Sequence, residues 1–233
     1  MRMFASAMVL VAHPDDADFM CGGTVAKWTE AGCEVHYVVI TDGSAGSNEP
    51  GATREQMREI RQREQRAAAD ALGVKSVTFL GELDGALEVN LDTRRKVCRE
   101  VRRLRPEVLV APDPSVLWRR RYVNHSDHKA AGVLALAAVM PDAPTRLMFP
   151  ELLDEGLEPY EVPNLWLSAA DPDTFVDITD TIDRKIEALA QHVSQDGNEA
   201  APFVQERAAE LGKAAGSTYA EGFKALRFVD DEE

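Results

Sequence analysis

Cysteine, positive charge and long apolar runs are all scarce in this chain of 233 residues. The three cysteines, Cys21, Cys33 and Cys98, show no short paired spacing, which argues against a disulfide scaffold and against a zinc ribbon. No apolar stretch approaches membrane-spanning length, and the opening run leads straight into a polar motif without a separate signal-peptide segment. We therefore expect a protein of the reducing cytoplasm with no membrane partner.

The charge balance is acidic, with a formal net charge of −14. No basic face is strong enough to follow a phosphate backbone, so we expect no nucleic-acid partner. The densest basic group, residues 119–121, is interpreted as a solvated loop. A hydrophobic share of 45% and a charged share of 28% are those of an ordinary globular domain. No linker or internal repeat divides the chain, so residues 1–233 are predicted to form a single domain. The composition leaves a homo-oligomer open.

Apolar strand-like runs alternate with helical patterns along the first half of the chain. Strands are expected at residues 7–11, 35–41, 76–80 and 108–111, and helices at 23–31, 54–72 and 91–104. This order predicts an α/β fold of the Rossmann-like kind, a mostly parallel sheet flanked by helices. In such a sheet the active site lies at the carboxyl ends of the strands. Further on we expect a helix at 128–140, strands at 146–149, 165–168 and 175–178, and helices at 181–193 and 202–214.

Two polar clusters each follow a predicted strand. His13-Pro14-Asp15-Asp16 comes after the first strand, and His125-Ser126-Asp127-His128 follows a much later one. On a first helical turn, residues three apart project to the same side, which groups the two histidines of the second cluster. Imidazole nitrogen and carboxylate oxygen suit Zn²⁺, and catalytic zinc usually has three protein ligands and one open position. If the loops meet, two histidines and one aspartate form such a site. The carboxylate and imidazole left over are what a metal-assisted hydrolase needs for proton transfer.

Each cluster also has an ordinary structural interpretation. A histidine after a strand is often a hydrogen-bonded structural residue, and adjacent aspartates are often turn formers or helix caps. Two such clusters in one topological position favour a metal site. The alternative from another class is a Rossmann-like nucleotide-binding module, suggested by Gly22-Gly23 before a helix. That alternative lacks G-x-G-x-x-G and gives His13, Asp15 and Asp16 no role, and it predicts a protein that purifies without stoichiometric zinc.

The segment Ala-His-Pro-Asp-Asp at residues 12–16, with the later His-x-Asp-His at 125–128, carries a resemblance. The chain resembles the PIG-L/LmbE-like family of zinc-dependent N-acetylglucosamine deacetylases. The likeness extends along essentially the whole chain, through residues 41–46, 60–74, 83–85, 185–195 and 219–223. It implies that His13, Asp16 and His128 are the metal ligands. The implied ion is Zn²⁺, with Fe²⁺ left open because imidazole and carboxylate ligands accept both.

The resemblance also implies roles for the other polar residues. Asp15 would be the general base, and His125 would stabilise the oxyanion and assist the departing amine. Asp127 would orient His125 by a hydrogen bond. Arg61 and Asp84 match positions that line the sugar pocket.

The expected function is hydrolysis of an amide in a small-molecule substrate. A metal-bound water would attack the acetyl group of an N-acetylated amino sugar or sugar conjugate, releasing acetate and the free amine. An amidase acting on a larger thiol-sugar conjugate or another amide with the same zinc site is the alternative within the hydrolases. The sugar itself is implied by the resemblance alone.

Overall fold

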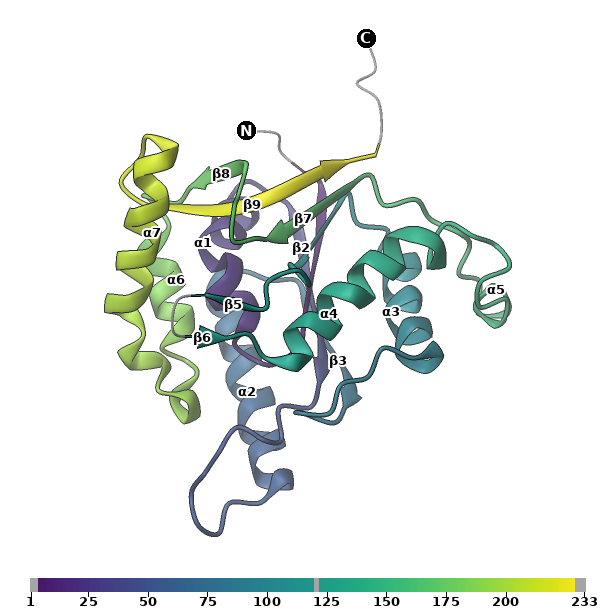
Figure 1. Cartoon of the computed structure of the whole chain (residues 1–233), viewed down its shortest axis with the longest axis horizontal. Coiled ribbons are helices and arrows are strands. Elements are labelled where there is room, and N and C mark those ends of the chain that lie inside the picture. The colour runs from purple at the N-terminus through teal and green to yellow at the C-terminus, as the bar shows by residue number, and fades with distance from the viewer. Residues whose placement is uncertain (1–3, 120–121, 229–233) are drawn as a thin grey trace.

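The computed structural model describes residues 4–119 and 122–228, so the basic group at 119–121 lies largely outside the described residues. Within that part, seven strands form one sheet. They are β1 (Ser6–Val11), β2 (Glu34–Thr41), β3 (Ser76–Glu82), β4 (Val108–Pro112), β7 (Asn164–Ser168), β8 (Thr174–Asp177) and β9 (Ala220–Arg227). Their order in the sheet is β3–β2–β1–β4–β7–β9–β8 (Figure 1). The first five run parallel, and β9 is antiparallel to both of its neighbours. The predicted α/β fold with a mostly parallel sheet is confirmed.

Helices cover both faces of the sheet (Figure 1). The helices on one face are α1 (Asp16–Glu30), α2 (Arg54–Leu72), α6 (Ile182–Leu189) and α7 (Ala201–Ala215). Those on the other are α3 (Leu91–Leu104), α4 (Ser126–Ala137) and α5 (Glu151–Asp154). Short helical turns lie at Ala138–Asp142, Val193–Gln195 and Gly197–Glu199, and a small hairpin pairs β5 (Trp118–Arg119) with β6 (Tyr122–Val123). None of the helices in the described part of the chain is long and apolar enough to cross a bilayer.

The central strand β1 explains why the sheet is covered on both sides. Val9 and Val11 pack into the core beneath α1 and α2, while Met8 and Leu10 pack into the core beneath α3 and α4. All four side chains are fully buried. An uninterrupted apolar run of this kind is the pattern of a parallel strand buried on both faces.

The strand order reverses direction at β1, which places the site. From β1 the chain passes outward through β2 to β3, and then returns to β4 on the other side of β1. Ligands of open α/β sheets bind outside the carboxyl ends of the strands at such a switch point. The loop leaving β1 and the connection from β4 to α4 both end there, and they carry the two polar clusters.

The first helix begins at Asp16, earlier than the predicted start at Gly23. Its backbone is non-helical at Cys21, so the helix consists of two segments joined at a kink. The second segment has its own cap, because the Glu221 carboxylate accepts from the backbone N–H groups of Gly23 and Thr24 at 3.0 and 2.7 Å. The sequence pattern therefore detected the second segment. The first segment, which carries Asp16, was missed.

One predicted strand in the C-terminal half was wrong, and one observed strand was not predicted. The segment 146–149 forms turns and bends, and the carbonyls of Met148 and of the adjacent Thr145 accept from the buried Arg102 guanidinium at 3.0 and 2.9 Å instead of from a neighbouring strand. Conversely β9 was not expected as a strand. Its alternation is broken by Glu221, a buried carboxylate used to cap α1.

Candidate metal centre

The two polar clusters meet at the carboxyl end of β1. Potential ligand atoms of His13, Asp16 and His128 all lie within 4.8 Å of one another. Asp16 is central, with Oδ2 lying 3.3 Å from His13 Nδ1 and Oδ1 lying 3.0 Å from His128 Nε2. The His13 backbone N–H donates to Asp16 Oδ2 at 2.8 Å, which holds this carboxylate against the loop. The three predicted ligands are therefore brought together as the donor set of a catalytic zinc site requires.

The hydrogen bonds of His13 identify the nitrogen that is free for a metal. Its Nε2 lies 3.2 Å from Asp127 Oδ2 and 3.3 Å from Asp84 Oδ1. Ionised carboxylates only accept hydrogen bonds, so these two hold a proton on Nε2. Nδ1, which faces Asp16 Oδ2, is then the nitrogen that can exchange its proton for a divalent cation, and the donor set fits such an ion.

A second set of donors, His13, His125 and Asp127, also lies within 4.8 Å. The Asp127 carboxylate in this set is already engaged. It accepts from the backbone N–H groups of Gly85 at 2.9 Å and Leu87 at 3.3 Å, besides His13. His125 Nδ1 accepts from the Asp127 backbone N–H at 3.2 Å. The set containing Asp16 and His128 is thus the better ligand set.

Electrostatics at the site favour a cation. Burial alone lowers the pKa of His13, but the neighbouring charge of Asp16 and hydrogen bonds with Asp127, Asp16 and Asp84 outweigh it and raise the pKa to about 12. Burial raises the pKa of Asp16, and the charges of His13 and His128 more than offset this and hold it well below the usual range. The carboxylates thus hold a proton on His13 where no other cation is present, and a divalent ion can replace it.

Asp15 lies beside the ligand set with an unusual backbone. Its φ is 98°, which non-glycine residues rarely adopt. The conformation is held from both sides: the Asp15 N–H donates to Gln65 Oε1 at 2.8 Å, and Arg61 Nη2 donates to Asp15 Oδ2 at 3.1 Å. Burial and the charge of Asp16 raise the pKa of Asp15 to about 6, against the opposing effect of Arg61. Its role as base stays a prediction, and its position beside the ligands fits that role.

Arg61 and Asp84 are buried and hydrogen-bonded to the loops around the site. Arg61 donates to Pro14 O at 2.8 Å and Gly43 O at 3.2 Å, and Asp84 Oδ2 accepts from the Ala45 N–H at 3.0 Å. The two side chains also contact each other at 3.2 Å. They hold the loop that carries His13 and Asp15 against the loop that follows β2. Contact with a sugar stays a prediction for both.

Asp127 faces a different histidine from the one expected. Its Oδ1 lies 3.9 Å from His125 Nδ1, beyond hydrogen-bond distance, whereas Oδ2 is 3.2 Å from His13 Nε2. Because His125 Nδ1 accepts a backbone N–H, the proton of its neutral ring is on Nε2, which is available to a ligand. Burial and the nearby charge of His13 lower the pKa of His125.

A buried network that was not predicted from the sequence lies under Asp15. Asp18, at the centre of it, accepts from Gln65 Nε2 at 2.8 Å, from Tyr37 Oη at 3.1 Å and lies 2.9 Å from His192 Nε2. Gln65 in turn accepts the Asp15 N–H. The local signals were a charged residue, Asp18, between Ala17 and the apolar run Phe19-Met20-Cys21, and the spacing of Gln65 four residues after Arg61. The network links His192 in the C-terminal segment to the loop that carries Asp15.

We expect Asp18→Ala to lower the free energy of unfolding by about 3–5 kcal/mol, because it leaves three buried donors without their acceptor. Urea unfolding of the purified protein measures this change. Asp70→Ala on the exposed side of α2 is the control and should shift stability by no more than about 0.5 kcal/mol. Equal stabilities of the two variants would show that the network contributes little.

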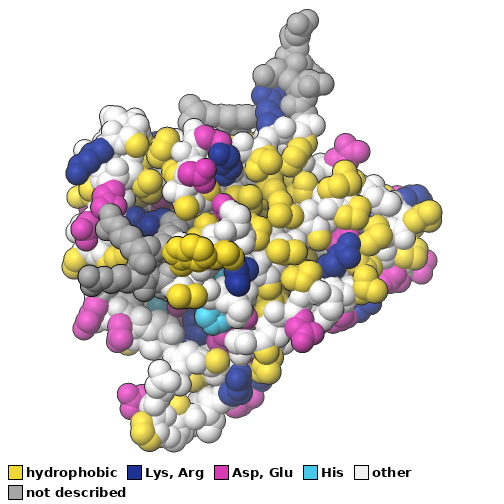
Figure 2. Space-filling view, viewed as in Figure 1, with side chains coloured by type: hydrophobic (Ala, Val, Ile, Leu, Met, Phe, Trp, Pro, Cys, Tyr) yellow, Lys and Arg dark blue, Asp and Glu magenta, His cyan; other side chains and the backbone are white. Residues whose placement is uncertain are grey.

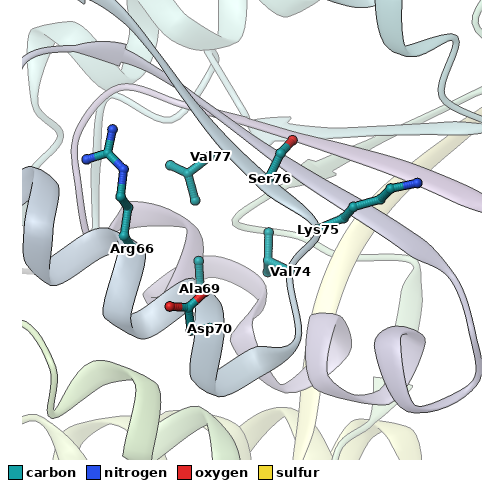
Figure 3. A pocket seen from close by; sticks show the side chains of 7 residues that line it. All are labelled: Arg66, Ala69, Asp70, Val74, Lys75, Ser76 and Val77. Carbon is teal, nitrogen blue, oxygen red and sulfur yellow. The ribbon is translucent and has the colours of Figure 1, made fainter.

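The site reaches the surface, where histidine side chains are visible beside hydrophobic ones (Figure 2). His125 is 44% exposed in its side chain, and the exposed apolar residues Leu117, Trp118 and Val123 belong to or adjoin the preceding hairpin. A separate hollow of about 220 Å³ lies between α2 and β3 (Figure 3). It is lined by Arg66, Asp70 and Ser76 among others, at the amino end of β3. The hollow is therefore on the opposite edge of the sheet from the metal centre.

Comparisons with known proteins agree with this geometry. The model of the PIG-L family, GlcNAc-PI de-N-acetylase, matches residues 8–139, which include both polar clusters. The chain is 32% identical over 222 residues to the diacetylchitobiose deacetylase of Thermococcus kodakarensis, covering 93% of this chain and 80% of that protein. The N,N'-diacetylchitobiose deacetylase structure from Pyrococcus horikoshii superposes with a TM-score of 0.89 at 31% identity, covering 96% of this chain and 84% of that one. The 4-carboxy-2-hydroxymuconate hydratase of Pseudomonas putida has a TM-score of 0.80 at 26% identity, with 98% of each chain covered.

Proposed function

The chain belongs to the PIG-L family of GlcNAc-PI de-N-acetylases, and from this premise we propose that it is a zinc-dependent N-deacetylase of a small N-acetylated amino sugar or sugar conjugate. The deacetylases among its relatives support hydrolytic deacetylation. The observation that carries the proposal is the convergence of His13, Asp16 and His128 within 4.8 Å, with Asp15 adjacent to them.

Each polar side chain has a defined task in this reaction. The chemistry that Zn²⁺ supplies when held by two imidazoles and a carboxylate is Lewis acidity toward a carbonyl oxygen and a water molecule. Asp15 takes the proton of the attacking water, whose oxygen forms the new bond to the acetyl carbon. The Nε2–H of His125 donates to the oxygen on which negative charge develops. The carbon–nitrogen bond then breaks, and the proton held by Asp15 passes to the departing amine.

Asp127 has a positioning task in this scheme. Since its carboxylate accepts from His13 Nε2, it keeps the proton on that nitrogen and directs Nδ1 toward Asp16. A carboxylate on the far nitrogen of a ligating imidazole also raises its basicity as a ligand. Asp127 therefore serves the metal site through His13.

The substrate class is proposed from the names of the relatives: two are diacetylchitobiose deacetylases, and one is a probable N-acetyl-alpha-D-glucosaminyl L-malate deacetylase of Bacillus anthracis. We expect release of free amine from N-acetylglucosamine derivatives, because a site that hydrogen-bonds sugar hydroxyls loses those bonds with simple amides. The assay compares N,N'-diacetylchitobiose and N-acetylglucosamine conjugates with N-acetyl amines, N-acetyl amino acids and a thiol-sugar amide. Turnover of the non-sugar amides at an equal or higher rate would reject the sugar substrate and leave the amide hydrolase.

Hydration of a carbon–carbon double bond is the second candidate, because the Pseudomonas putida hydratase aligns over 98% of this chain. A base and a Lewis-acidic ion can also serve addition of water to such a bond. The same panel therefore includes 4-carboxy-2-hydroxymuconate. Its consumption without any amine release would identify a hydratase.

A cytoplasmic location is proposed on the state of the cysteines. Cys21, Cys33 and Cys98 are all unpaired and buried, as expected for a protein of a reducing compartment. Such a compartment also keeps Fe²⁺ available, and the same three ligands accept it.

A further inference from the structure

Asn124 lies between the β5–β6 hairpin and α4, directly before His125. Its backbone N–H and both polar atoms of its side chain have partners. Its backbone N–H donates to Leu117 O at 2.9 Å, and its side-chain Nδ2 donates to Val116 O at 2.8 Å. Its Oδ1 lies 3.0 Å from His128 Nδ1. The side chain thus joins the base of the hairpin to one of the proposed metal ligands.

The Val116 carbonyl determines the direction of both side-chain hydrogen bonds of Asn124. The Val116 carbonyl only accepts, so the amide group that faces it must be the NH₂ group of Asn124. The opposite side of the amide, facing His128, is then the oxygen. An amide oxygen only accepts, so His128 Nδ1 carries a proton and donates it. In the neutral ring this leaves a lone pair on Nε2, the atom that lies 3.0 Å from Asp16 Oδ1.

We infer that Asn124 is a positioning residue for the metal centre, which sets the His128 tautomer and holds the ring so that Nε2 faces the ion. The inference rests on the proposed role of His128 as a ligand. It gives the two histidine ligands different arrangements: His13 is held through Nε2 by carboxylates and presents Nδ1, and His128 is held through Nδ1 by an amide and presents Nε2. In each imidazole, the nitrogen that does not face Asp16 is therefore held by a hydrogen bond, with carboxylates on His13 and with Asn124 on His128.

Zinc affinity measures this role directly. We expect Asn124→Leu, which removes the acceptor for His128 Nδ1–H, to weaken Zn²⁺ binding by about 10- to 100-fold. Asn124→Asp keeps an acceptor at the same place and should bind Zn²⁺ within a few-fold of the unmodified protein, although both variants lose the bond to Val116 O. Titration of the metal-free proteins with Zn²⁺ against a chromogenic chelator gives the affinities without reference to activity.

Asp113→Ala is the matched control, because it removes a different hydrogen bond from the segment between β4 and α4. Asp113 Oδ1 accepts the Ser115 N–H at 2.8 Å in the segment that leads to the hairpin, and the bond between Asn124 and His128 is untouched. Its zinc affinity should be unchanged. Equal weakening by Asp113→Ala and Asn124→Leu would assign the effect to the hairpin and overturn the inference. So would Asn124→Asp binding as weakly as Asn124→Leu.

His128→Ala separates this inference from the ligand assignment. If Asn124→Leu binds Zn²⁺ normally and His128→Ala does not, Asn124 has no positioning role and the metal site stands. If His128→Ala also binds normally, the proposed ligand set is wrong. Nitrogen NMR of the zinc-loaded unmodified protein tests the tautomer of His128 without any substitution, and only five histidines contribute signals. A protonated Nδ1 on His128 is the expected result, and a protonated Nε2 would contradict the inference.

Discussion

Asp15→Asn is expected to retain zinc and the fold while losing about 10²-fold or more in kcat, the range that general-base catalysis supplies. The asparagine side chain cannot take a proton from water. The carboxylate lies beside the ligand set and belongs to neither group of potential ligands, so the metal should stay bound. Steady-state kinetics with the best substrate of the panel, together with elemental analysis, measure both quantities.

The substitution suits the backbone at this position. Asparagine tolerates a positive φ better than most residues, and the N–H of residue 15 can still donate to Gln65. Asp113→Asn, a carboxylate change on the β4–β5 connection, is the control and should leave kcat unchanged. An Asp15→Asn variant that purifies without metal would make Asp15 a ligand. Unchanged kcat with full metal would assign the base to another group.

The parts of the site that depend on local sequence were predictable. A polar cluster after an apolar strand lies at the carboxyl edge of a parallel sheet whatever the rest of the chain does, so His13 and Asp16 could be placed from sequence. The spacing of His125 and His128 put both on the first turn of a helix, and α4 begins at Ser126. The βαβ order indicated that both clusters lie at one edge of the sheet, and the structure brings them within 4.8 Å of each other.

The partners of these residues could not be predicted, because they come from distant segments. The family resemblance implied that Asp127 orients His125, two residues away. At the start of α4, however, His125 Nδ1 accepts the Asp127 backbone N–H as a helix cap, and the carboxylate turns toward His13, 114 residues earlier. Likewise Asp18 contacts His192 across 174 residues. Contacts of this length depend on how helices pack on the sheet, which no short pattern encodes.

The predicted start of the first helix was wrong for a related reason. Gly22-Gly23 was interpreted as the approach to a helix, but both glycines lie inside α1. A Cβ atom at Gly23 would lie 2.7 Å from Ile178 Cδ1, so the glycine is required by close packing against the segment that follows β8. The sequence shows the glycine and does not show the neighbour that requires it.

His128→Ala and His13→Ala are each expected to purify with little or no zinc and to lose nearly all activity. Removal of one of three protein ligands leaves two, which cannot hold the ion in a closed geometry. His36→Ala is the matched control: this histidine lies on β2, pairs with Ser76 Oγ at 2.7 Å and should leave the zinc content unchanged. Elemental analysis after dialysis against a metal-free buffer gives the stoichiometry, and full occupancy in either ligand variant would reject the assignment.

The zinc content of a third variant, His125→Ala, distinguishes between the two donor sets that share His13. If the ion is held by Asp16 and His128, His125→Ala keeps its zinc and loses activity only through the missing donor to the oxyanion, by about 10²- to 10³-fold in kcat. If the ion is held by His125 and Asp127, the pattern reverses: His125→Ala loses zinc and His128→Ala keeps it. The first pattern is expected, because the Asp127 carboxylate already accepts from Gly85, Leu87 and His13, whereas the Asp16 carboxylate faces both His13 Nδ1 and His128 Nε2, the nitrogens assigned to the ion.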